Sequence, residues 1–210
     1  KSEVLNPERL ADPIELATPR YWVNLTDIES ACSSKGISSQ YFLCFRRSTR
    51  STDARTAIFC AIPPYGVGDS VFLMLPQNNP APCLLASSNS YPFDFIVRNS
   101  LGGENASFFI IKQIPALPPQ AYGILGAWDN TNAQKTGWIT KRILELTYTA
   151  HDLATFAQNC GFDGPPFLWD ENRRFLLRCE LDAAFFHLYL PANQDGSWKK
   201  ADGETDSELA

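Results

Sequence analysis

Short apolar runs separated by turn residues dominate the first 119 positions of the chain, and they predict β-strands. Residues 41–45 form an aromatic-rich run, residues 57–62 are almost continuously apolar, and residues 71–75 are again apolar. Uninterrupted apolar runs of this length are typical of buried strands, so we expect residues 57–62 to be buried on both faces. Two further short strands are predicted at residues 20–23 and 107–111.

Two helices are predicted within this first part. Thr26, followed three positions later by Glu29, is typical of a capping box, and Gly36 is placed to end the short helix that would follow. Residues 83–98 contain Pro92 near their middle. Because proline is tolerated only in the first turn of a helix, we expect a helix that breaks or begins there.

After residue 137 the hydrophobic period becomes helical. The apolar positions of the first helical unit, which is interrupted at residues 149–151 and ended by Gly161, are Ile139, Ile143, Leu146, Leu153 and Phe156. Asp170 is placed to cap a long last helix. The apolar stripe predicted for that helix comprises Phe175, Leu176, Cys179, Leu181, Phe185 and Leu188.

These patterns predict a mixed α+β fold, with a strand-rich first part and a C-terminal helical part. We expect a lead-in linker at residues 1–18, a mixed α/β region at 19–119, a connector at 120–137, a helical region at 138–190, and a disordered acidic tail at 191–210.

Composition agrees with an ordinary globular protein, with 44% hydrophobic and 20% charged residues. No two of the six cysteines lie closer than twelve positions, so no CxxC zinc pair exists, and we expect free thiols in a reducing cytoplasm. No signal peptide or membrane-length apolar run is present. The chain begins with Lys1 and has one methionine, Met74, so we expect it to be part of a longer protein.

The net charge of −5 argues against a nucleic-acid-binding protein, but its distribution matters more. Residues 191–210 hold two lysines and five acids and so carry −3 of that total. Four arginines opposed only by Asp53 fall within ten residues, namely Arg46, Arg47, Arg50 and Arg55, and Ser48 and Thr49 add hydroxyl donors. Such a loop suits DNA phosphates. The alternative is a solvated surface loop without a ligand.

A second candidate for DNA contact follows residue 97. Arg98 and Asn99 have the side chains that read guanine and adenine edges, and Asn105 lies close by in the chain. Gly102 and Gly103 would let the backbone approach a ligand closely. The alternative is a tight turn that requires glycines with positive φ.

No catalytic constellation is evident. Residues 62–65 (Ile-Pro-Pro-Tyr) resemble the tetrapeptide of amino-methyltransferases, but Ile62 cannot accept a hydrogen bond from a target amine, so a Pro-Pro turn is the simpler interpretation. No glycine-rich loop for a methyl donor follows a strand. No residue lies at metal or triad spacing from His151 or His187, and we interpret both as core or surface residues. We therefore expect this fragment not to be an enzyme.

Together, several segments resemble a known family. They are residues 54–63, 66–68, 84–86, 89–90, 93–95, 98, 102–103, 108–115, 142–150, 163–167 and 178–184. This combination resembles the TaqI-like specificity region that follows the methylase domain in restriction-modification methyltransferases, including those of type IIG, type ISP and the DISARM defence system. The methyl-donor and catalytic motifs of those proteins are absent from this chain.

The resemblance implies that residues 19–119 read double-stranded DNA and that the helical part braces them or docks to an N-terminal methylase domain. It implies a parent that transfers a methyl group from S-adenosylmethionine to the exocyclic amine of adenine, with or without endonuclease activity. The candidate DNA-binding residues are Arg46, Arg47, Ser48, Thr49, Arg50, Arg55, Asn89, Ser90, Arg98, Asn99, Gly102, Gly103 and Asn105. The alternative is a protein-docking scaffold for other subunits of a defence complex, without its own DNA contact.

Overall fold

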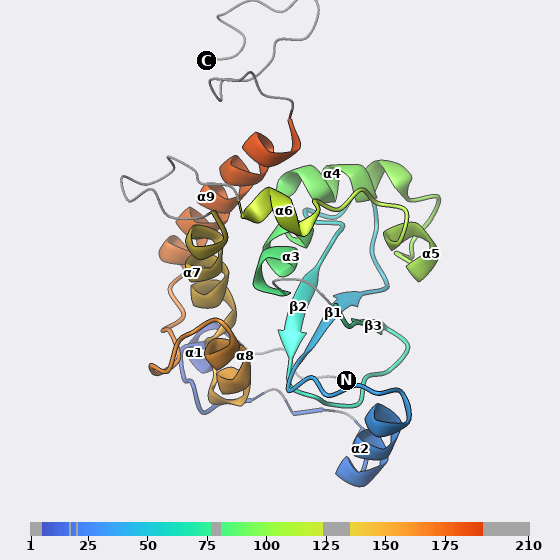
Figure 1. Cartoon of the computed structure of the whole chain (residues 1–210), viewed down its shortest axis with the longest axis vertical. Coiled ribbons are helices and arrows are strands. Elements are labelled where there is room, and N and C mark those ends of the chain that lie inside the picture. The colour runs from blue at the N-terminus through green and yellow to red at the C-terminus, as the bar shows by residue number, and fades with distance from the viewer. Residues whose placement is uncertain (1–5, 17, 20, 77–80, 124–134, 191–210) are drawn as a thin grey trace, which may run out of the picture.

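A three-stranded antiparallel sheet lies at the centre of the computed structural model, which describes residues 6–16, 18–19, 21–76, 81–123 and 135–190 (Figure 1). Its strands are β1 (Phe42–Arg46), β2 (Phe59–Ile62) and β3 (Val71–Met74), in the order β2-β1-β3. Cys44 of β1 lies opposite Cys60 of β2 and Leu73 of β3. The sheet therefore leaves β2 and β3 as its two edges.

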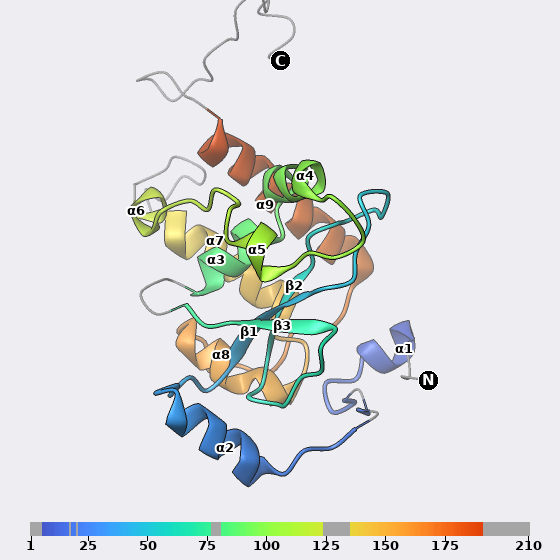
Figure 2. The same ribbon diagram turned by 90° about the vertical axis from the view of Figure 1, so that its right-hand side faces the viewer.

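Helices surround this sheet. They are α1 (Pro7–Leu10), α2 (Leu25–Ser34), α3 (Ala81–Ser88), α4 (Tyr91–Ser100), α5 (Phe108–Ile111), α6 (Pro119–Tyr122), α7 (Lys135–Thr147), α8 (Ala154–Asn159) and α9 (Glu171–Tyr189), with a 3-10 turn, η1, at His151–Leu153. Helix α3 packs on α7, and α4 and α7 both pack on α9. Figures 1 and 2 show α7 and α9 together on one side of the sheet, while α2 lies at the opposite end of the molecule from α4.

One face of the sheet is packed with aromatic rings. Phe45 lies 5.3 Å from Phe59, 5.5 Å from Phe72 and 5.4 Å from Phe108 between ring centroids, and Phe59 continues the cluster to Phe93 of α4 at 5.7 Å. Most of these pairs are edge-to-face, which is a favoured aromatic geometry. This cluster fixes α4 and α5 against the sheet and so positions the loops that join them.

The mixed α+β class is confirmed. The first part is not strand-rich, however, because the described residues of 19–119 hold more helix, in α2 to α5, than strand. Several local predictions also agree with the structure. Pro92 lies in the first turn of α4, Gly36 has φ of 65° just after α2, and Asp170 caps α9 by accepting a hydrogen bond from the Arg173 backbone N–H at 2.7 Å. Gly161, with φ of 77°, follows α8 as expected.

Three of the predicted strands need correction. Residues 108–111 form the helix α5 rather than a strand, because the Ser107 hydroxyl caps them by accepting from the Ile110 N–H. Residues 21–23 belong to no strand and are exposed. Of the apolar run at residues 57–62, only residues 59–62 form a strand, β2. Cys60 in this strand is exposed, so β2 is not buried on both faces.

Two helix details were also wrong. Helix α2 begins at Leu25 with Asn24 as its N-cap, so Thr26 lies inside the helix and forms no capping box with Glu29. In α9 the buried face is Leu177, Leu181, Ala184 and Phe185, whereas Phe175, Leu176 and Cys179 are exposed. The prediction was therefore right at Leu181 and Phe185 and wrong at Phe175, Leu176 and Cys179. So many positions of α9 are apolar that periodicity alone does not select one face.

Parts of the predicted organisation lie outside the described residues. They are residues 1–5 and 17 of the lead-in, residues 20 and 77–80 of the mixed region, positions 124–134 of the connector and the acidic tail at 191–210. The lead-in contains the short helix α1. No helix within the described ranges is long and apolar enough to cross a bilayer.

Candidate nucleic-acid interface

Two loops that are far apart in the sequence lie side by side. The loop after β1 and the loop after α4 are joined by backbone hydrogen bonds from Thr49 N to the Glu104 carbonyl at 3.0 Å and from Ala106 N to the Arg47 carbonyl at 2.8 Å. An isolated β-bridge pairs Ser48 with Asn105. We call residues 46–53 and 101–105 together the arginine ledge. The structure thus brings both sequence-predicted loops into one surface.

The ledge is fastened internally by hydroxyl groups. The buried Thr49 hydroxyl donates to the Thr56 carbonyl at 2.7 Å, and the Thr56 hydroxyl donates to the Arg50 carbonyl at 3.1 Å. Thr49, a predicted phosphate donor, is therefore only 3% exposed and holds the loop's shape.

Asp94 of α4 anchors the far end of the same loop. One of its carboxylate oxygens, Oδ1, accepts hydrogen bonds from the backbone N–H groups of Thr56 at 2.6 Å and Ala57 at 2.7 Å. Asp94 is 1% exposed. Bonds of this kind to an ionised acceptor are among the stronger ones in proteins, so the loop ends in a rigid attachment to α4.

Arg98, one turn further along α4, holds the middle of the loop. Its guanidinium donates to the carbonyls of Ser51 at 2.6 Å and Asp53 at 2.8 Å, and to Asp94 Oδ2 at 3.2 Å. The sequence predicts Arg98 as a base-reading residue, and that role stays a prediction. In this geometry its donors face the protein, which favours a positioning role.

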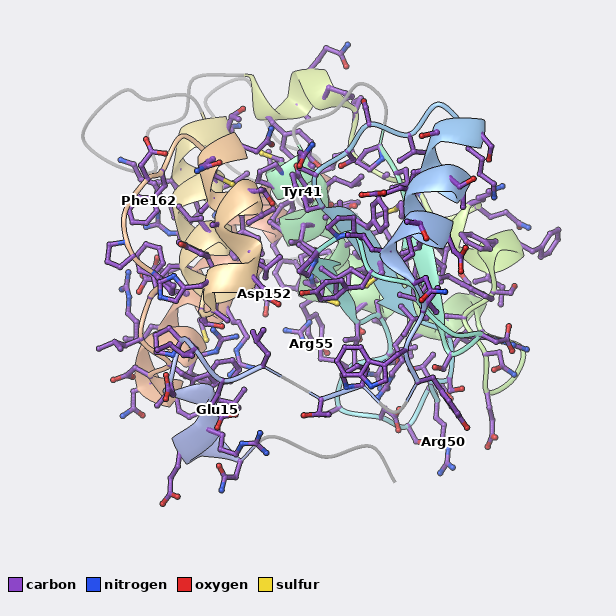
Figure 3. All side chains as sticks on the ribbon, turned by 90° about the horizontal axis from the view of Figure 1, so that it is seen from below. Glu15, Tyr41, Arg50, Arg55, Asp152 and Phe162 are labelled. Atoms are coloured by element: carbon purple, nitrogen blue, oxygen red, sulfur yellow. The ribbon has the colours of Figure 1, made fainter. Side chains whose placement is uncertain are left out.

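Three arginines remain on the outer side of the ledge, and each has a carboxylate partner. Arg46 pairs with Asp53 at 3.0 Å, Arg47 pairs with Asp69, and Arg50 pairs with Glu104 at 3.6 Å. The Arg50 side chain is 66% exposed and lies at the periphery of the molecule in Figure 3. A depression of about 380 Å³ lies between Arg46, Arg50, Glu104 and Asn105.

Arg55 does not join this group. Its Nη2 donates to Asp182 of α9 at 2.6 Å, and its guanidinium lies 5.3 Å from the ring centroid of Tyr91. Figure 3 shows Arg55 between the helical side of the molecule and the sheet, away from Arg50. The spacing in the sequence grouped it with the ledge, but the chain turns inward before residue 55.

Asn89 and Ser90 have structural partners. Asn89 Oδ1 accepts from the Phe59 N–H, and its Nδ2 donates to the Phe59 carbonyl, both at 3.0 Å. The amide thus pairs with the outer edge of β2 as a neighbouring strand would. Ser90 is buried and its hydroxyl donates to the Ser87 carbonyl at 2.7 Å.

The glycines of the second loop have no special backbone requirement. Gly102 and Gly103 are exposed, with no atom within 4 Å of the point where a Cβ would lie, and positive φ among the described glycines occurs only at Gly36 and Gly161. The expectation of a positive-φ turn at these glycines was wrong. Asn99 lies in the last turn of α4 and donates to the Phe95 carbonyl at 2.7 Å.

The other motifs lie apart from the ledge. Tyr65 follows β2 in a turn in which its N–H approaches the Pro63 carbonyl at 2.6 Å. His151 and His187 are both on the surface. Within the residues that the structure places, no group of three His, Cys, Asp or Glu side chains is arranged to hold a metal ion.

Sequence reasoning missed the acidic side of this surface. Asp69 and Glu104 pair with ledge arginines although they lie 22 and 54 positions away in the chain. Only Asp53 was visible as a local counter-charge. The signal for Asp94 was its place one helical turn before Arg98, an i,i+4 spacing that favours ion pairs.

Comparisons with known proteins add no relative: neither the protein-family models, nor the curated proteins, nor the solved structures include a significant match to this chain.

Proposed function

We propose that this chain is the DNA-contacting, target-recognition segment of an adenine-specific DNA methyltransferase from a restriction-modification or related phage-defence system. The observation that carries DNA contact is the arginine ledge, in which two loops with exposed arginine and amide groups are locked together and fastened to α4 by Asp94 and Arg98. Binding loops on a rigid scaffold are the usual arrangement for recognition.

The ion pairs of the ledge do not prevent phosphate binding. Arg46, Arg50 and their carboxylate partners are all more than a third exposed, and exposed ion pairs contribute only about 0–1 kcal/mol. A DNA phosphate could therefore replace Asp53 or Glu104 as the partner of an arginine at small cost. The paired carboxylates would also disfavour binding at positions where phosphates do not fit, which raises selectivity for the correct docking geometry.

The methyltransferase assignment rests on the resemblance of the segments between residues 54 and 184 to TaqI-like specificity regions. In that arrangement the methylase domain of the parent binds S-adenosylmethionine and transfers the methyl group. This chain would position the duplex, with phosphate contacts from Arg46, Arg47 and Arg50 and amide contacts from Asn99 or Asn105.

The test is a fluorescence-anisotropy titration with a labelled mixed-sequence duplex at several salt concentrations. If three ledge arginines contact phosphates, log K should fall with log salt at a slope of about −2.7, from about −0.9 per contact. Replacing Arg46, Arg47 and Arg50 by alanine should remove most of this slope and weaken binding to all sequences alike.

A matched control makes the same change in charge elsewhere. Alanine at Arg9, Lys35 and Arg173 removes three positive charges from α1, the end of α2 and α9. Equal loss of affinity in both triple variants would show a non-specific effect of net charge and would contradict the proposal for the ledge. No salt-dependent binding by the unmodified chain would contradict it outright.

A protein-docking role is the second candidate, and exposed apolar residues favour it. Tyr21, Trp22 and Val23 are 75%, 80% and 56% exposed, and Leu25 of α2 is 61% exposed. Consecutive exposed apolar side chains are typical of surfaces that contact another protein. Co-purification of the chain with the parent methylase domain, compared between the unmodified chain and a Tyr21→Ser, Trp22→Ser variant, tests this role.

A further inference from the structure

A pocket of about 440 Å³ lies between the edge strand β2 and the helices α3, α7 and α9, away from the arginine ledge. Its floor and walls are largely apolar and include Ile58, Leu85, Ile143, Leu146 and Leu181. Sites for small molecules commonly have this size and this predominance of apolar lining. A simple inorganic ion would contact little of such a surface.

The polar groups of the pocket are mostly cationic. Among the described residues, Arg55, Arg174 and Arg178 line it, and Asp182 is the only carboxylate there. Asp182 is already occupied, because it accepts from Arg55 at 2.6 Å and from the Tyr91 backbone N–H at 2.6 Å. The lining therefore carries a formal +2, from three arginines and one aspartate, in a chain whose net charge is −5.

Arg174 and Arg178 lie one turn apart on α9, and within the described part of the chain neither forms an ion pair. Arg174 stacks on Trp169 at 3.6 Å to the ring centroid and donates to the Leu146 carbonyl at 2.9 Å. Burial, and then the charge of Arg178, lower the pKa of Arg174. Glu171 acts in the opposite direction on the pKa of Arg174, but it lies outside the pocket lining. Two like charges thus share one side of an apolar pocket, and neither is in an ion pair within the described residues.

Arg55 adds an unused donor at the same place. Its Nη1 atom is buried and has no hydrogen-bond partner among the residues that the structure describes. Leaving such a charged donor unsatisfied is costly, and an anion bound beside Arg55 in this pocket would offer it an acceptor.

We propose that this pocket binds a small anionic ligand with a flat apolar body, such as an aromatic sulfonate, carboxylate or phosphate ester. The anionic group lies between Arg178, Arg174 and Arg55, and the apolar body lies against Leu146 and Leu181. This inference is independent of the proposed DNA contact, because the pocket and the ledge depression share no lining residue.

The test uses three probes on the full chain, followed by fluorescence and calorimetry. 8-Anilino-1-naphthalenesulfonate has both the anion and the apolar body, N-phenyl-1-naphthylamine lacks the anion, and inorganic phosphate lacks the body. We expect saturable binding of the sulfonate at one site, at least tenfold weaker binding of the neutral amine, and displacement by phosphate only at much higher concentration.

Variants assign that binding to the pocket. Arg178→Ala should weaken sulfonate binding by about tenfold, and because the Arg178 side chain is exposed this change should leave thermal unfolding unchanged. Arg173→Ala is the matched control, since Arg173 is on the same helix but pairs with Glu145 outside the pocket. Ile58→Trp, which fills the pocket from its rim, should abolish binding. Equal affinities for the Arg178 and Arg173 variants, or equal affinities for the sulfonate and the neutral amine, would overturn the proposal.

Discussion

The attachment of the arginine ledge to α4 is the feature of this fold whose contribution to stability can be estimated best. Asp94 is almost fully buried, and it accepts two backbone N–H groups at 2.6 and 2.7 Å and the Arg98 guanidinium at 3.2 Å. Replacing Asp94 by alanine leaves two buried backbone donors without an acceptor and leaves the Arg98 guanidinium without its carboxylate partner. Removing one partner of a buried, hydrogen-bonded ion pair typically costs about 3–5 kcal/mol, and we expect that loss here.

Asparagine at the same position separates the contribution of the two backbone hydrogen bonds from that of the ion pair with Arg98. Its carbonyl oxygen could still accept from Thr56 and Ala57, since both bonds go to the same oxygen, Oδ1. Its amide NH2 group would face the Arg98 guanidinium, so that two hydrogen-bond donors would point at each other. We therefore expect Asp94→Asn to cost about 1.5–3 kcal/mol, the size of one hydrogen bond to a charged group.

Urea unfolding at pH 7, followed by far-ultraviolet circular dichroism, measures both variants against the unmodified chain. The m-value should stay constant while the midpoint falls, and for a chain of this size the Asp94→Ala variant should melt roughly 6–20 °C lower. A cost below about 1 kcal/mol for Asp94→Ala would refute the reasoning, because that is the contribution of an exposed ion pair. So would equal losses for alanine and asparagine.

Three further predictions follow from other parts of the structure. Asn89→Leu should lower the free energy of unfolding by about 2 kcal/mol in the same urea assay, because it leaves both the backbone N–H and the backbone carbonyl of Phe59 without their side-chain partner. A loss no larger than that of a surface substitution would contradict this role. Cys44 and Cys60 lie opposite each other with their Sγ atoms 3.2 Å apart, and the hydrogen bond from Cys44 lowers the pKa of Cys60. Hydrogen peroxide should therefore join them, with both thiol protons leaving in two molecules of water, and non-reducing peptide mass spectrometry should find the 44–60 link in preference to links among other cysteines. Burial raises the pKa of Cys83 to about 12. The pKa of Cys83 in the folded chain thus lies above the ordinary thiol value of 9.0, so the neutral buried thiol contributes fully to stability below pH 9, and this contribution is lost as pH rises towards 12. Cys83→Ala should therefore flatten the fall of the urea midpoint between pH 9 and pH 12. An unchanged slope of midpoint against pH would refute this role of Cys83.

Local features of this chain could be predicted from its sequence because their bonds form within a few residues. The proline in the first turn of α4, the Asp170 cap of α9 and the glycine after α2 all follow from backbone sterics or from hydrogen bonds spanning three or four positions. The loop at residues 46–53, which forms one side of the arginine ledge, could also be predicted from its cluster of charged residues. The same local logic, applied consistently, would have found α5, since Ser107 is a good N-cap.

Only the tertiary structure decided which of the predicted residues share a surface. Arg55 and Asp182 are 127 positions apart. They meet because the residues that follow Arg55 are bonded to Asp94 of α4, and α4 packs on α9. Nothing in the sequence near either residue indicates the other. Arg98 resembles a base-reading arginine in sequence, yet packing turns its donors towards the loop it supports. The sequence determined where charges and helix ends lie along the chain, whereas long-range burial determined which charges are paired internally and which remain at the surface for a ligand. The physical reason is that an ion pair depends on separations of a few ångströms in space, and those separations are set by how the apolar faces of distant elements pack together.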